Sequence, residues 1–408
     1  MALGRDTLWS TTNEVGRMVS ALVIFVLVAR ELGPDVYGVL AGTQAFASIA
    51  ATLSSSSVVL YLLQETVREG HALEAVLPIA LGLALGAAAL VVAVSLALAP
   101  FLLPTAPIVA IVGFAIVEAV GSAGVAVGAG SVQAAHGYAA SARVWTVYLY
   151  GRTLVVAGLA VASAVTLRSV VLAQAAFALA CGVGGLRYAS RRTGVRLRVA
   201  RPAKADVQRT FSYSITTGGF SVNEDADKTL MVKLAPAFDA GIYAAAYRVL
   251  GPVLAPVRAL VTASHTRFLA DDPDVPGEHL RRAARYSLAA GAYGAVATTG
   301  LVLLAPFALD LLGGGFEDAA TVLRWVAPMV MLRTLGLFPF NALLGLRQNG
   351  LRNVIVLTCA AANVVANVAL IPRYSWKGAA AATLGCEILF LTMTWTGVVV
   401  HQRRRDAR

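Results

Sequence analysis

The sequence predicts an all-α, polytopic membrane protein, and three observations carry that prediction. Of its 408 residues, 58% are hydrophobic and only 13% are charged, and its mean hydropathy is +0.73. This is more apolar than a water-soluble surface can hide. Apolar stretches of about 20 residues recur along the chain, each long enough to cross about 30 Å of hydrocarbon as a helix. Segments of about ten residues with alternating polarity, which would predict a membrane β-barrel, are not apparent.

The apolar stretches fall into two sets, which predicts two helical bundles. Residues 1–188 hold the first set and residues 210–408 the second, giving about twelve transmembrane helices in all. Residues 189–209 are the most basic stretch of the chain and are expected to form a cytoplasmic linker. An even number of spans in each half predicts two parallel six-helix bundles around a central cavity.

Positive charge predicts the orientation of the chain, because Lys and Arg accumulate in cytoplasmic loops. With the N-terminus inside, the inner side collects the linker cations and a basic C-terminal tail, and only a few cations lie outside: Arg30, Arg168, Lys233, Arg373 and Lys377. Both termini are therefore predicted to be cytoplasmic, in a multi-pass protein of the cell membrane. The first apolar stretch has no small-residue cleavage site and is expected to remain in the protein. The net charge of +11 follows from this bias and from attraction to anionic lipid headgroups, rather than from nucleic-acid binding.

Charged residues inside the predicted spans are the most informative ones. Each would cost about 2.5 to 3.5 kcal/mol at a helix centre facing lipid, so they are expected to face one another or water. They are the cations Arg17, Arg152, Lys228, Arg248, Arg258, Arg324 and Arg333, and the acids Glu14, Glu118, Glu224, Asp225, Asp227 and Glu387.

Two helices carry these charges at the end of a polar stripe. At about 100° per residue, each set falls on one face of its helix: Ser10, Asn13, Glu14, Arg17 and Ser20 on the first, and Ser214, Thr217, Ser221, Glu224 and Lys228 on the seventh. We expect these faces to line a water-filled cavity, with Asn13, Ser20, Ser214, Thr217 and Ser221 as its polar lining. The alternative is that Glu14 with Arg17, and Glu224 with Lys228, are local ion pairs that neutralise each other for insertion.

Surplus cations in such a cavity would attract a phosphate or pyrophosphate group. The leading candidates are Arg17, Lys228, Arg248 and Arg258. The last two lie beside helix-bending prolines, and each has the alternative of extending its side chain to the membrane interface.

Metal and nucleophile chemistry have no support in the sequence. Cys181, Cys359 and Cys386 fall inside predicted helices and are expected to be packing residues, without a disulfide or a metal site. Gly82 with Gly86, and Gly124 with Gly128, have the spacing that permits close helix contact. A Gly-rich phosphate loop and a nucleophile elbow are missing, so we expect a protein that is not an enzyme and needs no cofactor.

Several motifs in order make the sequence resemble a known family. They are Ala29-Arg30-Glu31-Leu32-Gly33-Pro34 with Tyr37-Gly38; Asp227-Lys228 leading to Gly241-Ile242-Tyr243; Gly315-Phe316 followed by Leu323-Arg324; and Asn363 and Asn367 with Ile371-Pro372-Arg373-Tyr374. Together they resemble the polysaccharide-unit flippases of the multidrug/oligosaccharidyl-lipid/polysaccharide (MOP) exporter superfamily, over essentially the full chain.

The resemblance implies movement of an isoprenoid-phosphate-linked or -pyrophosphate-linked sugar unit from the inner to the outer leaflet by alternating access. Hydroxyls, Asn363 and Asn367 would bond the sugar, and the cations would hold phosphate. Polymerase and glycosyltransferase partners of a polysaccharide pathway would follow. The superfamily also implies coupling to a proton or sodium gradient, for which the candidates are Glu118, Asp225, Asp227 and Glu387.

Two other functions remain open. A cation-coupled drug or metabolite antiporter of the same superfamily would have acids and aromatic residues dominating its cavity. A membrane-embedded polysaccharide polymerase or glycosyltransferase would need a sizeable outer loop with catalytic residues, whereas the longest predicted outer segment, Pro100 to Pro107, is short and uncharged. Glu14 beside Arg17 also weakens the phosphate-binding role predicted for Arg17.

Overall fold

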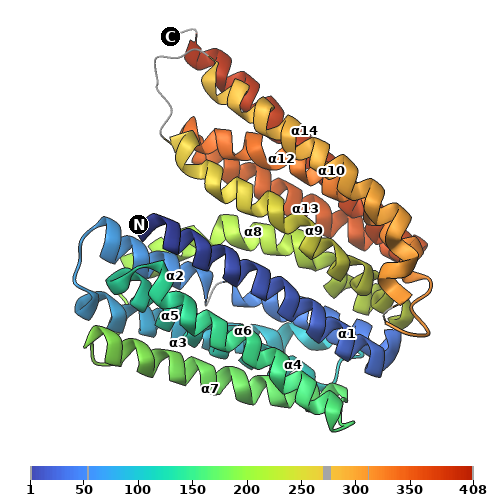
Figure 1. Ribbon diagram of the computed structural model, residues 1–408, viewed down its shortest axis with the longest axis horizontal. Coiled ribbons are helices and arrows are strands. Elements are labelled where there is room, and N and C mark those ends of the chain that lie inside the picture. The colour runs from blue at the N-terminus through green and yellow to red at the C-terminus, as the bar shows by residue number, and fades with distance from the viewer. Residues whose placement is uncertain (1, 53–54, 270–276, 311, 407–408) are drawn as a thin grey trace. The chain divides into compact units, whose positions relative to one another are not determined.

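The computed structural model describes residues 2–52, 55–269, 277–310 and 312–406 (Figure 1). At residues 2–15, 265–267, 269, 308–310 and 406 it describes the backbone but not the side chains. These ranges contain helices and no β-strand, and ten of the helices are long and apolar enough to cross a membrane. The predicted all-α, multi-pass fold is confirmed.

Packing divides the chain into two compact units, Met1–Lys233 and Leu234–Arg408. The first unit holds α1 (Ala2–Ala51), α2 (Ser56–Leu63), η1 (Gln64–Arg68), α3 (Leu73–Leu102), α4 (Ile108–Ala115), η2 (Ile116–Gly121), α5 (Ser122–His136), α6 (Tyr138–Val161), α7 (Leu167–Thr193) and α8 (Lys204–Leu234). The second holds α9 (Ala237–Leu269), α10 (Glu278–Asp310), α11 (Ala319–Val326), α12 (Pro328–Gly345), α13 (Asn349–Tyr374) and α14 (Trp376–Asp406).

Two features of the fold explain why ten candidate spans are counted where about twelve transmembrane helices were predicted. The first candidate span, Gly16–Arg68, is 53 residues long and bends at Gly33, whose backbone has φ 71°. Gly33 tolerates this left-handed conformation and Pro34 follows it, so the predicted first turn is a kink between two helices. Helix α8 has 31 residues, about 46 Å of helix. It is long enough to span, but it is too polar to be counted by composition.

A seam of small residues joins α5 to α7 in the first unit, where these helices lie side by side (Figure 1). A Cβ on Gly124 would lie 2.9 Å from the Cα of Gly182, and one on Gly128 would lie 2.7 Å from the carbonyl carbon of Gly185. Real Cβ atoms do not approach so closely, and only glycine fits. The close contact predicted for Gly124 and Gly128 is therefore present.

The division between the units falls later than the basic linker at residues 189–209. Helix α7 ends at Thr193, and the segment after it packs on α3, where the Ala200 N–H donates to Pro78 O at 2.9 Å. Helix α8 then contacts the first unit through paired hydroxyls: Ser214 lies 2.7 Å from Ser57, and Ser221 lies 2.9 Å from Thr52. These contacts place α8 with the helices that precede the linker.

The motif Gly315-Phe316 is a turn at the start of α11. Gly315 has φ 97°, and its N–H donates to both carboxylate oxygens of Glu317, at 3.1 and 3.0 Å. Backbone N–H groups of Glu317 itself and of Gly315 hold the pKa of the Glu317 carboxyl below its ordinary value. Phe316 is buried at the base of the turn.

Candidate functional site

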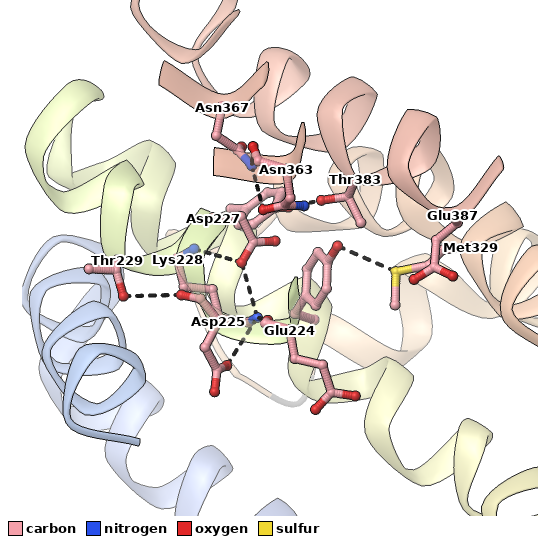
Figure 2. A network of polar contacts seen from close by, with 12 residues as sticks. Glu224, Asp225, Asp227, Lys228, Thr229, Met329, Asn363, Asn367, Thr383 and Glu387 are labelled. Carbon is pink, nitrogen blue, oxygen red and sulfur yellow. Dashed lines mark hydrogen bonds and ion pairs between the residues drawn. The ribbon is translucent and has the colours of Figure 1, made fainter. Parts of the chain in front are cut away.

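Charged groups gather near the end of α8, where Lys228 contacts two acids (Figure 2). Its Nζ lies 3.3 Å from an oxygen of Asp225 and 3.3 Å from one of Asp227, and it also donates to the backbone carbonyl of Glu224. The side chains of Lys228 and Asp227 are 15% and 1% exposed. Local ion pairs with Asp225 and Asp227 therefore neutralise this lysine.

Most of the predicted polar stripe is used in contacts between helices of the first unit. The Ser20 hydroxyl of α1 donates to Leu149 O of α6 at 2.9 Å and lies 2.5 Å from the Thr153 hydroxyl. Ser214 and Ser221 pair with α2 and with the end of the first helical segment, as described above, whereas Thr217 donates to Tyr213 O within its own helix at 3.2 Å. Asn13 lies in the stretch whose side chains the structure does not describe.

The other predicted cations lie on α1 and α9. Arg17 and Arg258 are exposed and Arg248 is half-buried. Arg17 and Lys228 belong to the first unit, and Arg248 and Arg258 to the second.

A pair of asparagines on α13 forms a buried polar spot in the second unit (Figure 2). Asn367 Nδ2 donates to Asn363 O at 2.9 Å and to Asn363 Oδ1 at 3.0 Å. Both side chains are fully buried, and Asn363 Nδ2 and Asn367 Oδ1 have no hydrogen-bond partner among the described residues. Buried amide groups without partners are rare in proteins and are suited to bonding an additional polar group.

A buried ion pair links α12 to α14. Arg333 donates to Glu387 Oε1 from both Nε, at 2.8 Å, and Nη2, at 2.5 Å. The Arg333 and Glu387 side chains are 11% and 3% exposed. The sequence indicated that both residues lie in spans, but it did not indicate that they form a pair.

Glu118 differs from the three other candidates for ion coupling. It lies on η2, a π-helical turn between α4 and α5, and its carboxylate has no hydrogen bond or ion pair with the residues that the structure describes. Nearby on α6, Arg152 donates to Gln174 Oε1 of α7 from Nε at 3.2 Å and from Nη2 at 2.6 Å. The Arg152 guanidinium also lies 5.5 Å from the centre of the Tyr148 ring.

A polar cluster around η1 was not predicted from the sequence. The Glu65 carboxylate on η1 accepts from Arg209 at 2.6 Å and lies 3.0 Å from His71 Nδ1. Its hydrogen bond and charge raise the pKa of the Arg209 guanidinium. Tyr61 donates to Asp206 at 2.9 Å beside them. No periodicity connects these positions, so only the fold brings them together.

Within the described part of the chain, no group of three or more His, Cys, Asp or Glu residues is placed to hold a metal ion. The three cysteines are free thiols inside helices.

Solved structures of transporters share this arrangement of helices. The lipid II flippase MurJ, in an inward closed conformation, matches with a TM-score of 0.68 and 10% identity over 98% of this chain and 90% of that chain. An inward-facing multidrug resistance MATE family transporter matches with 0.66 and 13% over 98% and 95%. A MOP superfamily transporter from Pyrococcus furiosus matches with 0.64 and 11% over 100% and 96%. The protein is thus a multi-pass membrane protein with the fold of MOP superfamily transporters.

The family is identified from the amino-acid sequence. Residues 3–264, more than half of the chain, match the polysaccharide biosynthesis protein family, and the chain belongs to that family. The resemblance found in its motifs is thereby confirmed. No curated protein sequence matches the chain.

Proposed function

We propose that this protein is a flippase that moves an isoprenoid-phosphate-linked or isoprenoid-pyrophosphate-linked sugar unit from the inner to the outer leaflet during polysaccharide or glycan assembly. The observation that carries the proposal is the family match over residues 3–264. The full-length likeness in fold to a lipid II flippase supports it. The chain would act by alternating access, without catalysing a covalent step.

The headgroup chemistry fits the polar residues in the helices. Lys228 would exchange Asp225 and Asp227 for phosphate oxygens, since all are anionic oxygen acceptors for one ammonium group. Arg17 in the first unit, and Arg248 and Arg258 in the second, are the other cations proposed to bind phosphate. The unsatisfied amide groups of Asn363 and Asn367 suit sugar hydroxyls, which both donate and accept hydrogen bonds.

Topology and energy supply complete the proposal. The protein would lie in the cell membrane with both termini cytoplasmic, as its positive charges predict. A proton or sodium gradient would drive the cycle, and no bound cofactor would be needed. Glycosyltransferases would deliver the lipid-linked substrate, and a polymerase would receive it.

The test is flipping of a fluorescent isoprenoid-pyrophosphate-linked sugar in liposomes that hold the purified protein. We expect Lys228→Ala and Arg248→Ala to slow flipping about tenfold or more, since a charge-assisted hydrogen bond contributes about 1.5–3 kcal/mol. Arg404→Ala, at an exposed position of the C-terminal helix, is the matched control and should flip at the native rate. Equal rates in all four proteins would remove Lys228 and Arg248 from the mechanism.

A cation-coupled drug or metabolite antiporter is the second candidate, and the likeness in fold to MATE transporters favours it. An antiporter would release cationic drugs from the same liposomes and would leave the lipid-linked sugar in place.

A further inference from the structure

One arginine of the second unit carries a charge that the described residues leave unpaired. Arg352 lies on α13, and its guanidinium lies over the ring of Phe340 of α12, 4.3 Å from the ring centre. Its side chain forms no hydrogen bond or ion pair with any residue that the structure describes. By contrast, Arg333 and Lys228 each contact a carboxylate. Arg352 therefore lacks a counter-ion within the described part of the chain.

The inner part of the Arg352 guanidinium is enclosed, and its two terminal nitrogens remain accessible. Nε is buried without a hydrogen-bond partner, whereas Nη1 and Nη2, which also have no partner among the described residues, are not buried. The Phe340 ring beneath is 4% exposed and packs on Phe390 of α14, with ring centres 5.4 Å apart. The guanidinium is thus held in place before any ligand binds, which lowers the entropic cost of binding.

Arg352 and Phe340 lie near one end of the second unit. Helix α12 ends at Gly345 and α13 begins at Asn349, so residues 346–348 form a short turn between them. Arg352 is about 5 Å along α13 from this turn, and Phe340 is about 8 Å back along α12. Both helices belong to candidate membrane spans. The guanidinium is therefore expected close to the boundary between hydrocarbon and lipid headgroups.

The chemistry of the unpaired guanidinium suits a phosphate group. A cation near the hydrocarbon is costly, and contact with an aromatic ring offsets only part of that cost. Nη1 and Nη2 form a planar fork of donors that matches two oxygens of one phosphate group. Phosphate is also the anionic group that membrane lipids present at this level. A phosphate group would supply the missing counter-ion and accept the unused hydrogen bonds.

Other positive charges lie at the same end of the unit. Helix α14 follows α13 directly and packs along it, so it returns to the end where α13 begins. Its last turn holds Arg403 and Arg404, which are exposed, and Arg347 is exposed in the turn between α12 and α13. An anionic lipid that approaches Arg352 would therefore meet a positively charged surface.

We propose that Arg352 binds the phosphate group of a membrane lipid through Nη1 and Nη2, at the end of the second unit that the sequence predicts to be cytoplasmic. A phospholipid headgroup and the phosphate of an isoprenoid-linked sugar offer the same chemistry. A phospholipid would stabilise the packing of α12, α13 and α14. An isoprenoid phosphate would bring the transported headgroup to the second unit, and this alternative alone rests on the flippase function proposed above.

Native mass spectrometry of the delipidated full-length protein measures this binding. The anionic probes are phosphatidylglycerol and a polyisoprenyl phosphate, with phosphatidylcholine, which is neutral overall, as the baseline. We expect Arg352→Gln to weaken binding of at least one anionic probe about tenfold or more, because it removes a charge-assisted pair of hydrogen bonds. Arg347→Gln is the matched control, since it removes an exposed charge from the adjacent turn, and it should bind both probes as the native protein does.

The same measurement identifies the source of the phosphate. Tighter binding of phosphatidylglycerol assigns the site to a phospholipid, and tighter binding of the polyisoprenyl phosphate assigns it to the transported lipid. Undiminished binding of both probes to Arg352→Gln overturns the site. An equal loss in Arg347→Gln and Arg352→Gln also overturns it, because diffuse surface charge then explains the binding. Inorganic phosphate that displaces both probes at equal concentration overturns a lipid as the source.

Modification of arginines by phenylglyoxal provides a test that needs no variant. We expect either anionic probe to slow modification of Arg352 in the native protein severalfold and to leave Arg347 unaffected. Equal rates at Arg352 with and without both probes overturn the site, even where Arg352→Gln does not fold. A protein that binds phosphatidylglycerol at Arg352 but flips no lipid-linked sugar contradicts the proposed flippase and leaves this site standing.

Discussion

Removing one partner of the Arg333–Glu387 ion pair should strongly destabilise the second unit. Both hydrogen bonds of this pair end on one carboxylate oxygen, and the two side chains are 11% and 3% exposed. In Glu387→Gln the guanidinium remains charged and buried, and the carboxylate beside it is replaced by a neutral amide. Breaking a buried pair in this way costs about 3–5 kcal/mol. The equilibrium constant for unfolding should therefore rise by about two to three and a half orders of magnitude.

Unfolding of the purified protein by sodium dodecyl sulfate in mixed micelles measures this change. Arg324→Gln is the matched control, because Arg324 is exposed and makes one hydrogen bond, to Val302 O. It should lose less than about 1 kcal/mol. The double substitution Arg333→Met with Glu387→Met should be more stable than Glu387→Gln alone, since it leaves no buried charge. A Glu387→Gln protein as stable as the native one, or a double variant less stable than Glu387→Gln, would refute the reasoning.

Three further predictions concern the first unit and the turn before α11. Gly128→Leu overpacks the contact between α5 and α7, so it should lower the free energy of unfolding by about 1–3 kcal/mol and lower the melting temperature. Gly86→Leu is the control: no atom lies within 4 Å of the Cβ position of Gly86, so its melting temperature should not change. Glu65→Gln should weaken the contact with the exposed Arg209 only slightly, which would be seen as faster proteolysis of the linker. Unchanged proteolysis would assign that contact no role. The pKa of Glu317 is lower in the folded protein than in the unfolded one, so its carboxylate stabilises the Gly315 turn at pH values above the unfolded pKa. This stabilisation is lost as the pH falls through the folded pKa, and hydrogen exchange at the Gly315 amide should then become faster. An exchange rate at Gly315 that shows no such change in the acid range would contradict the prediction.

Composition and motif order were sufficient to predict the fold class and the family. Apolar stretches of spanning length identify helices because the bilayer fixes their length. The kink at Gly33 was predictable as a turn, since glycine followed by proline suits a break between two helices. The close approach of Gly128 to α7 agreed with its spacing to Gly124, whereas Gly86, with the same spacing to Gly82, has no atom within 4 Å of its Cβ position.

Partners between distant helices could not be predicted in the same way. Periodicity assigned Ser214 and Ser221 to one face of α8, but it did not reveal that Ser57 and Thr52 lie opposite them. The pairing of Arg333 with Glu387 depends on how α12 packs on α14, which local spacing does not determine. A local ion pair between Glu224 and Lys228 was the alternative to a cavity lining, and spacing did not indicate that Asp225 and Asp227 each lie 3.3 Å from Lys228.

The π-helical turn at Glu118 could not be recognised from the sequence pattern. Residues Ile116–Gly121 read as a continuous part of an apolar span, and one extra residue per turn changes neither composition nor hydropathy. The position of Glu118 in a span was therefore predictable, but its place on a π-helical turn was not.

Translocation of a lipid-linked sugar across the bilayer by the native protein tests the proposed flippase function most directly. One preparation of proteoliposomes would contain an isoprenoid-pyrophosphate-linked sugar, and reaction of its headgroup with a membrane-impermeant reagent would be followed over time. A second, otherwise identical preparation would contain a cationic drug, and its release would be measured. The proposed function predicts protein-dependent exposure of the sugar headgroup and no release of the drug. Release of the drug without exposure of the headgroup, from folded protein and with several sugar heads tried, would contradict the flippase and favour the antiporter.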